Sequence, residues 1–140
     1  PEPSTPEIDH SLQGYSILVV DDDRDSNDLA AFVLKEAGAT VITAPSGIEA
    51  LEKLNSIDLL VSDIGMPELD GYQLLEQVRQ TVLIPAIALT AYAGGSDQQR
   101  AIKAGFQAHL AKPIEPTEFL SIVVSLLKNP VEPAPQSLQS

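Results

Sequence analysis

Segments of strand and helix character alternate strictly along this chain, and this order constrains the fold more than any other feature. Apolar or β-branched runs predict strands, and apolar residues at helical spacing predict helices. Strands are expected at 15–20, 39–44, 58–63, 85–90 and 107–112, and helices at 27–38, 46–55, 70–80, 96–105 and 115–129. Apolar strands that alternate with helices form parallel sheets covered on both faces, so the sequence predicts an α/β, doubly wound fold with a five-stranded parallel sheet.

The helical segments contain residues that predict their ends and buried faces. Gly38 is a suitable stop for the first helix, and Asp70 is a suitable N-cap for the third. Ile48, Leu51 and Leu54 lie on one face of the second helix, which is the apolar face of that helix.

The last helix carries two apolar stripes. The first contains Phe119, Ile122, Val123 and Leu126, and the second contains Leu120, Val124 and Leu127. One stripe must face the sheet. The other either completes the core, which we favour, or forms a surface for docking or self-association.

Composition limits the class of protein. The chain has 140 residues, no cysteine and a net charge of −12, which suits one acidic domain without disulfides. The negative charge argues against direct binding of nucleic acid and agrees with a divalent cation as ligand. No apolar run reaches the roughly 18 residues that a membrane span requires. We therefore expect a cytoplasmic domain without membrane contact.

The two ends differ from the middle of the chain. Residues 1–14 and 129–140 contain six of the eleven prolines and no apolar periodicity. We interpret both as linkers or disordered tails around a domain at 15–128. Ordinary frayed termini are the alternative.

Charged and polar residues stand where the expected strands end. The carboxyl ends of parallel strands meet at one edge of the sheet, where such folds place their chemistry. This edge receives Asp21, Asp22 and Asp23 from the first strand, Asp63 from the third, Thr90 and Ala91 from the fourth, and Lys112 from the fifth. Carboxylates this close repel one another, so the pattern predicts a bound cation. Asp23, Asp25 and Asp28 are better explained as the solvated first turn of a helix.

Four motifs in series carry a family resemblance. The stretches ILVVDDD, LLVSDIGMPELDG, LTAYA and HLAKP stand in an order and at a spacing that resemble the receiver domain of two-component response regulators. The resemblance covers Ser16 to Lys128 and implies the flavodoxin-like sheet order 2-1-3-4-5. It also implies a signalling phosphoacceptor, not an enzyme, whose partner is a histidine kinase or a histidine phosphotransfer domain. The parent chain could be a hybrid histidine kinase.

The resemblance assigns the acidic residues to phosphorylation and metal binding. Asp63 matches the phosphoacceptor. Asp22 matches the direct ligand of Mg²⁺ (or Mn²⁺), and Asp21 the residue that assists through water. Asp63 and the main-chain carbonyl of Gly65 match further ligands. Oxygen donors of this kind suit a hard cation.

The resemblance also assigns the other strand-end residues. Thr90 and Lys112 match the switch hydroxyl and the lysine that contacts the phosphoryl group, and the N–H of Ala91 is a further donor. His109 stands where the family commonly has an aromatic switch residue. It could swing toward Thr90 on phosphorylation or stay outside in water. Pro113 matches a proline preceded by a cis peptide bond.

Two positions are expected to tune dephosphorylation. Gly65 lacks a side chain and Tyr92 is bulky. The resemblance implies that these two positions flank the path of an attacking water.

Two alternative functions remain open from the sequence. The triplet Asp21-Asp22-Asp23 formally satisfies the nucleophile motif of haloacid-dehalogenase-like phosphatases, although Asp25 departs from that pattern. Such an enzyme would be phosphorylated on Asp21 and turn over repeatedly. The other alternative is a degenerate receiver that only binds partners.

Overall fold

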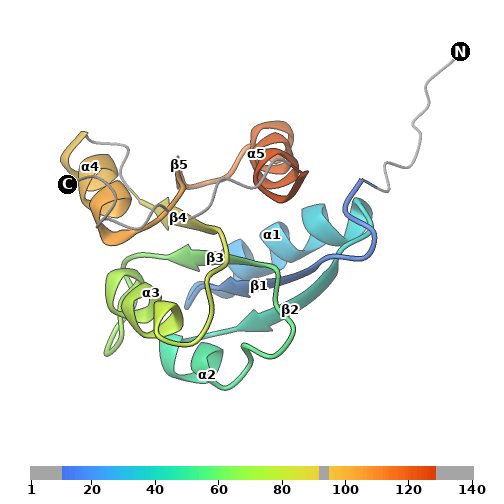
Figure 1. Cartoon of the computed structure of the whole chain (residues 1–140). Helices are drawn as coiled ribbons and strands as arrows, with labels where there is room; N and C mark the ends of the chain where they lie inside the picture. The colour runs from blue at the N-terminus through green and yellow to red at the C-terminus, as the bar shows by residue number, and fades with distance from the viewer. Residues whose placement is uncertain (1–10, 92–94, 129–140) are drawn as a thin grey trace, which may run out of the picture.

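The computed structural model describes residues 11–91 and 95–128, without the side chains of residues 95–98. Its strands and helices alternate as the sequence predicts (Figure 1). The strands are β1 (Ser16–Val20), β2 (Thr40–Ala44), β3 (Leu59–Asp63), β4 (Ala86–Thr90) and β5 (Ala108–Ala111). The helices are α1 (Arg24–Glu36), α2 (Gly47–Leu51), α3 (Gly71–Arg79), α4 (Gly95–Ala104) and α5 (Pro116–Lys128). All strand pairs are parallel, in the order β2-β1-β3-β4-β5, which confirms the expected topology.

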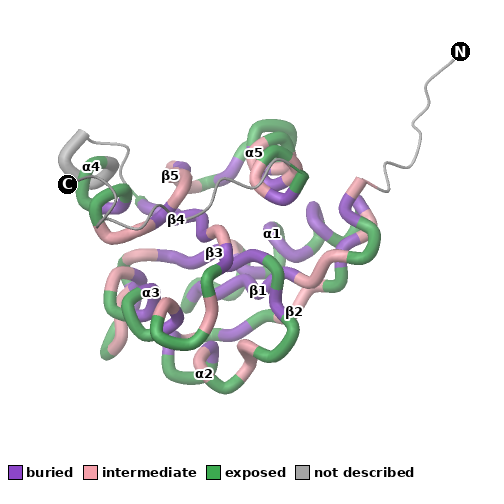
Figure 2. The backbone as a smooth tube through the Cα atoms, viewed as in Figure 1, coloured by how far each residue is buried: buried purple, intermediate pink, exposed green. Residues whose placement is uncertain are grey.

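Helices cover both faces of the sheet, and each face has its own core (Figures 1 and 2). Alternate residues of a strand point to opposite faces. Ile17 and Val19 accordingly join a cluster with α1 and α5, whereas Leu18 and Val20 join a cluster with α2, α3 and α4. All four are fully buried, which explains why β1 reads as a continuous apolar run. Among the helices of the described residues, none is long and apolar enough to cross a membrane.

The first helix begins earlier than its apolar pattern suggests. Asp23 is its N-cap, and the Asp23 carboxylate accepts hydrogen bonds from the backbone N–H of Asp25 and the hydroxyl of Ser26. The start therefore lies at Arg24 and not at residue 27. The interpretation as a helical first turn is confirmed for Asp23, which is the N-cap, and for Asp25, whereas Asp28 lies beyond the first turn of α1.

The second helix is shorter than predicted, and only part of its predicted apolar face packs on the core: Leu51 and Leu54 contact the core cluster, whereas Ile48 does not. The helix ends at Leu51, so Leu54 lies beyond it. Ile48 is 50% exposed, while Gly47 and Ala50 face the core. A Cβ on Gly47 would lie 2.9 Å from the carbonyl oxygen of Leu69, so the close approach of that loop selects the small residues as the buried side.

The last helix uses both predicted stripes for the core. Its buried row is Phe119, Val123 and Leu127, spaced by four residues, and this row combines members of the two stripes. The partly buried side chains that pack against the same cluster are Leu120, Ile122, Val124 and Leu126. The favoured interpretation, that the second stripe completes the core, is confirmed for these contacts.

The folded part of the chain begins before residue 15. Leu12, which we expected in a linker, is fully buried in the cluster beneath α1 and α5. Its backbone N–H donates to the carbonyl of Ala37, next to the turn that Gly38 makes with φ +100°. Residues 11–14 therefore belong with the domain, because burial of one leucine offsets the ordering of a short segment.

Leu12→Ala should lower the free energy of unfolding by about 2–5 kcal/mol, because it removes a fully buried side chain. Leu83→Ala is the matched control: Leu83 is 70% exposed, so its loss should change the value by less than about 0.5 kcal/mol. Urea denaturation of both variants measures the difference. Equal effects would show that residues 11–14 do not stabilise the fold.

Candidate functional site

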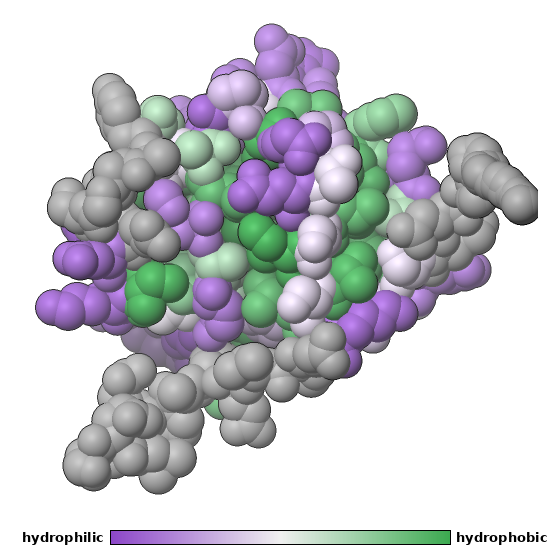
Figure 3. Space-filling view, turned by 90° about the horizontal axis from the view of Figure 1, so that it is seen from above, coloured by the Kyte–Doolittle hydropathy of each residue, from purple (hydrophilic) through white to green (hydrophobic). Residues whose placement is uncertain are grey.

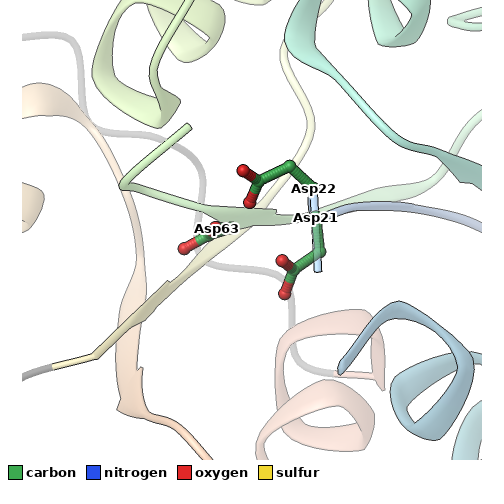
Figure 4. A group of neighbouring side chains, drawn as sticks. All are labelled: Asp21, Asp22 and Asp63. Carbon is green, nitrogen blue, oxygen red and sulfur yellow. The ribbon is translucent and has the colours of Figure 1, made fainter. Parts of the chain in front are cut away.

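Three carboxylates meet where β1 and β3 end. Asp21 and Asp22 directly follow β1, and Asp63 is the last residue of β3, which pairs with β1 in the sheet (Figure 4). An oxygen from each carboxylate lies within 4.8 Å of the others. Asp21 and Asp63 are buried and Asp22 is exposed, so the group opens to solvent on one side.

Asp21 is held by main-chain and side-chain donors. Its carboxylate accepts a hydrogen bond from the backbone N–H of Asp23 at 2.9 Å and from Lys112 Nζ at 3.2 Å. The buried Asn27 donates through Nδ2 to the carbonyls of Asp21 and Ala44. Asn27 on α1 thereby fixes the ends of the paired strands β1 and β2.

The turn after Asp63 is shaped by two glycines. The backbone N–H of Gly65 donates to Asp63 Oδ1 at 3.3 Å, and a Cβ on Gly65 would meet nothing within 4 Å. Gly71 donates to the carbonyl of Ile64, and a Cβ there would lie 2.5 Å from the carbonyl oxygen of Asp63. Only glycine fits at position 71. Asp70 caps α3 as predicted, in a reciprocal capping box with Gln73.

Lys112 is the cation closest to the carboxylates. Its Nζ lies 3.2 Å from Asp21 Oδ2 and 3.5 Å from Asp63 Oδ1. Burial alone lowers the pKa of Lys112, but Asp21 and Asp63 outweigh it and raise that pKa above its usual value. The ammonium therefore stays charged at neutral pH.

The single positive charge of Lys112 does not neutralise the three carboxylates of the site. Burial, and then the charge of Asp21, raise the pKa of Asp63 above its usual value, although Lys112 opposes this. Partial desolvation, and then the hydrogen bond and charge of Asp63, raise the pKa of Asp22 above its usual value. Because Asp22 is exposed, solvent screens its interaction with Asp63. Clustered oxygen donors with excess negative charge fit a hard divalent cation such as Mg²⁺.

Two of the three carboxylates, those of Asp22 and Asp63, line a cavity of about 310 Å³. The predicted residues that the fold brings around it are Asp22, Asp63, Gly65, Thr90, Ala91 and Lys112. Ile64, Tyr72 and Arg100 also line it, and sequence reasoning missed them. Tyr72 and Arg100 lie on helices, so they gave no strand-end signal. Tyr92 lies outside the described residues.

The fifth strand contributes two further predicted residues. The peptide bond between Lys112 and Pro113 is cis, as the resemblance implies. His109 pairs in register with Ala88 of β4. Its Nε2 is buried and has no hydrogen-bond partner within the part of the chain that the structure describes.

Comparison with known protein families identifies the family of the chain. The family model for the response regulator receiver domain matches residues 17–124. The chain belongs to this family. The match includes every residue that lines the cavity, and it argues against the alternative of a haloacid-dehalogenase-like phosphatase.

Individual proteins of known sequence and solved structures are also similar to this chain. An uncharacterised 14.6 kDa protein of Leptolyngbya boryana is 47% identical over 81% of this chain and 90% of its own length. The sensor histidine kinase RcsC of Escherichia coli is 38% identical over 80% of this chain, which spans only 12% of that kinase. Among solved structures, a CheY-like receiver domain protein from Methanospirillum hungatei is 30% identical with a TM-score of 0.75, over 82% of this chain and 94% of its own. A Francisella response regulator receiver domain is 33% identical with a TM-score of 0.74, over 83% and 98%.

Asp63→Asn should raise the stability of the metal-free protein at pH 7. A carboxyl whose pKa is raised on folding destabilises the folded state above that pKa, and the penalty disappears as pH falls to the unfolded value near 3.8. The gain in urea midpoint should therefore be largest at neutral pH and shrink on acidification.

Asp28→Asn is the control for this measurement, since Asp28 is exposed on α1 and the change in charge is the same. If the two variants shift the midpoint equally, or if Asp63→Asn lowers it at pH 7, the carboxylate cluster does not destabilise the fold.

Proposed function

We propose that this receiver domain accepts a phosphoryl group from a phospho-histidine protein onto Asp63, with Mg²⁺, and then changes conformation to signal to a partner or neighbouring domain. The observation that carries the proposal is the position of Asp63. Its carboxylate lines an open cavity, lies 3.5 Å from the Lys112 ammonium and belongs to a cluster of three acids.

The transfer itself needs one nucleophile and several charged or polar contacts. An Asp63 oxygen forms the new bond to phosphorus, the phosphorus–nitrogen bond of the donor breaks, and the imidazole nitrogen keeps the electron pair. Lys112 places a positive charge beside the phosphoryl oxygens. The Thr90 hydroxyl and the N–H of Ala91, which line the same cavity, are further donors in the proposal.

The metal would be held by the three aspartates and the main-chain carbonyl of Gly65. Bound Mg²⁺ (or Mn²⁺) supplies charge that offsets the carboxylates and the incoming phosphoryl oxygens. In the proposal Asp22 is the direct ligand and Asp21 assists through water. The ion pair between the buried Asp21 and the partly buried Lys112 favours that division, because it occupies part of the Asp21 carboxylate.

Two further roles are part of the proposal. His109 reports the state of Asp63, and its buried, unpartnered Nε2 leaves a polar atom available for a new contact among the described residues. Gly65 tunes dephosphorylation together with Tyr92. The open space at Gly65 leaves room for water beside Asp63.

The partner in the proposal is a histidine kinase or a histidine phosphotransfer domain. The chain itself acts as a phosphoacceptor and not as an enzyme, although its parent could be a hybrid histidine kinase. The lack of cysteine agrees with a cytoplasmic location. Self-association or docking through α5 is a secondary proposal, because several apolar residues of α5 are only partly buried. The face of the molecule seen in Figure 3 exposes apolar residues among hydrophilic ones.

Incubation with acetyl phosphate and Mg²⁺ should label the protein on Asp63, and Asp63→Asn should abolish the label because an amide is a poor nucleophile. Mass spectrometry measures the added phosphoryl group and its position. Asp28→Asn, an exposed site on α1, should label like the wild type. Label on Asp21, or undiminished label in Asp63→Asn, would contradict the proposal.

Asp22→Ala should weaken Mg²⁺ binding and slow phosphorylation together, because one carboxylate of the cluster is lost. Asp23→Ala removes the same charge from the neighbouring residue, which caps α1 and lies outside the cluster. It should keep Mg²⁺ affinity and lose about 1 kcal/mol of stability. Titration calorimetry separates the two, and unchanged affinity in Asp22→Ala would remove Asp22 from the metal site.

A further inference from the structure

A second cation lines the cavity of Asp63. Arg100, an exposed residue of α4, lies with its guanidinium carbon 4.1 Å from the centre of the Tyr72 ring on α3. Tyr72 in turn makes an edge contact with Phe106, with ring centres 6.4 Å apart. Both Arg100 and Tyr72 line the cavity that also contains Asp63, Thr90 and Lys112. The arginine therefore rests on an aromatic side chain that is itself packed in place.

The two cations that line the cavity, Lys112 and Arg100, differ in their contacts with carboxylates. Lys112 is already paired with Asp21 and Asp63. Arg100 has no carboxylate within ion-pair distance among the side chains that the structure describes. Its guanidinium instead contacts the ring of Tyr72. An exposed cation–π contact is weaker than a charge-assisted hydrogen bond. An anion in the cavity would therefore compete well for the guanidinium.

The balance of charges at the site favours a second cation, because the phosphoryl group brings further negative charge. Lys112 and a divalent metal together would balance the three carboxylates and leave the incoming phosphoryl group uncompensated. The donor must also approach a protein with a net charge of −12. A guanidinium at the cavity wall offsets this repulsion where the anion enters, and its planar donors suit phosphoryl oxygens.

We propose that Arg100, positioned by the ring of Tyr72, binds the phosphoryl group during its transfer to Asp63 and speeds that transfer. This inference rests on the proposed function. With acetyl phosphate, an Asp63 oxygen bonds to phosphorus, the phosphorus–oxygen bond to the acetyl group breaks, and acetate leaves with the electron pair. Arg100 contacts the oxygens that remain on phosphorus, and Tyr72 is a positioning residue.

The test compares rates of labelling by acetyl phosphate at fixed Mg²⁺. Arg100→Gln should slow labelling about tenfold, the order expected for loss of one charge-assisted hydrogen bond. Lys103→Gln removes the same charge from the same helix, at an exposed residue that does not line the cavity, and should stay near the wild-type rate. Equal slowing in both variants would show a general charge effect and overturn the proposal.

Two measurements separate binding of the phosphoryl group from simpler explanations. Mg²⁺ affinity should be unchanged in Arg100→Gln, because Arg100 is not part of the acidic cluster. A parallel loss of Mg²⁺ affinity would place the effect on the metal and overturn the proposal. Tyr72→Phe keeps the ring and should keep the rate, whereas Tyr72→Leu removes it and should slow labelling as Arg100→Gln does. Equal rates for Tyr72→Phe and Tyr72→Leu, with both folded by urea denaturation, would overturn the positioning role.

Labelling of the wild type and of Arg100→Gln separates the role of Arg100 from the role of Asp63 as phosphoacceptor. If the wild type is labelled on Asp63 and Arg100→Gln is labelled at the same rate, Arg100 does not contact the phosphoryl group and the phosphoacceptor role stands. If the wild type is not labelled on Asp63 at all, the proposed function itself is wrong.

Discussion

Repulsion among Asp21, Asp22 and Asp63 is the constraint on which the rest of this structure depends. Two of the three are buried, and their oxygens lie within 4.8 Å of one another. The protein offsets part of this repulsion with the Lys112 ammonium and with backbone N–H groups from Asp23 and Gly65. The rest is uncompensated: burial, and then the neighbouring carboxylates, raise the pKa values of Asp22 and Asp63 above their usual range. A cation bound among these carboxylates would relieve their repulsion, and this relief would favour its binding.

The fold supplies this arrangement through the ends of neighbouring strands. β1 and β3 lie in the middle of the sheet, with helices on both faces, so their last residues have fixed positions. Asn27 joins the ends of β1 and β2, and Gly71 lets α3 begin against the carbonyl of Asp63. Lys112 arrives from the opposite part of the chain because β5 runs parallel to β4 at the edge of the sheet. A parallel sheet thus gathers residues that are 91 positions apart, such as Asp21 and Lys112.

The sequence predicted the sheet and its chemical edge well, because both depend on local patterns. Buried strands are continuous apolar runs, and the residues that follow them share one edge. It failed where packing between elements decides the outcome. Ile48 is exposed because the loop at Leu69 packs on Gly47, and Leu12 is buried although its segment has no apolar period. Tyr72 and Arg100 could not be found either, since their contact depends on how α3 and α4 lie across the cavity.

The position of α3 connects the acceptor turn to α4. At its start, Gly71 donates to Ile64, the residue after Asp63. At its end, the half-buried Arg79 donates to the carbonyls of Ile84 and Gly105, where α4 is followed by the turn into β5. Arg79 is fixed by these carbonyls and by Gln107, and burial lowers its pKa, so it has a structural role that Arg100 does not share. Hydrogen bonds thus anchor α3 at both ends, and Tyr72 lies in its first turn, next to the acceptor turn. In the proposed role of Arg100, this anchoring gives the ring of Tyr72 a defined position from which the guanidinium on α4 contacts a phosphoryl group on Asp63.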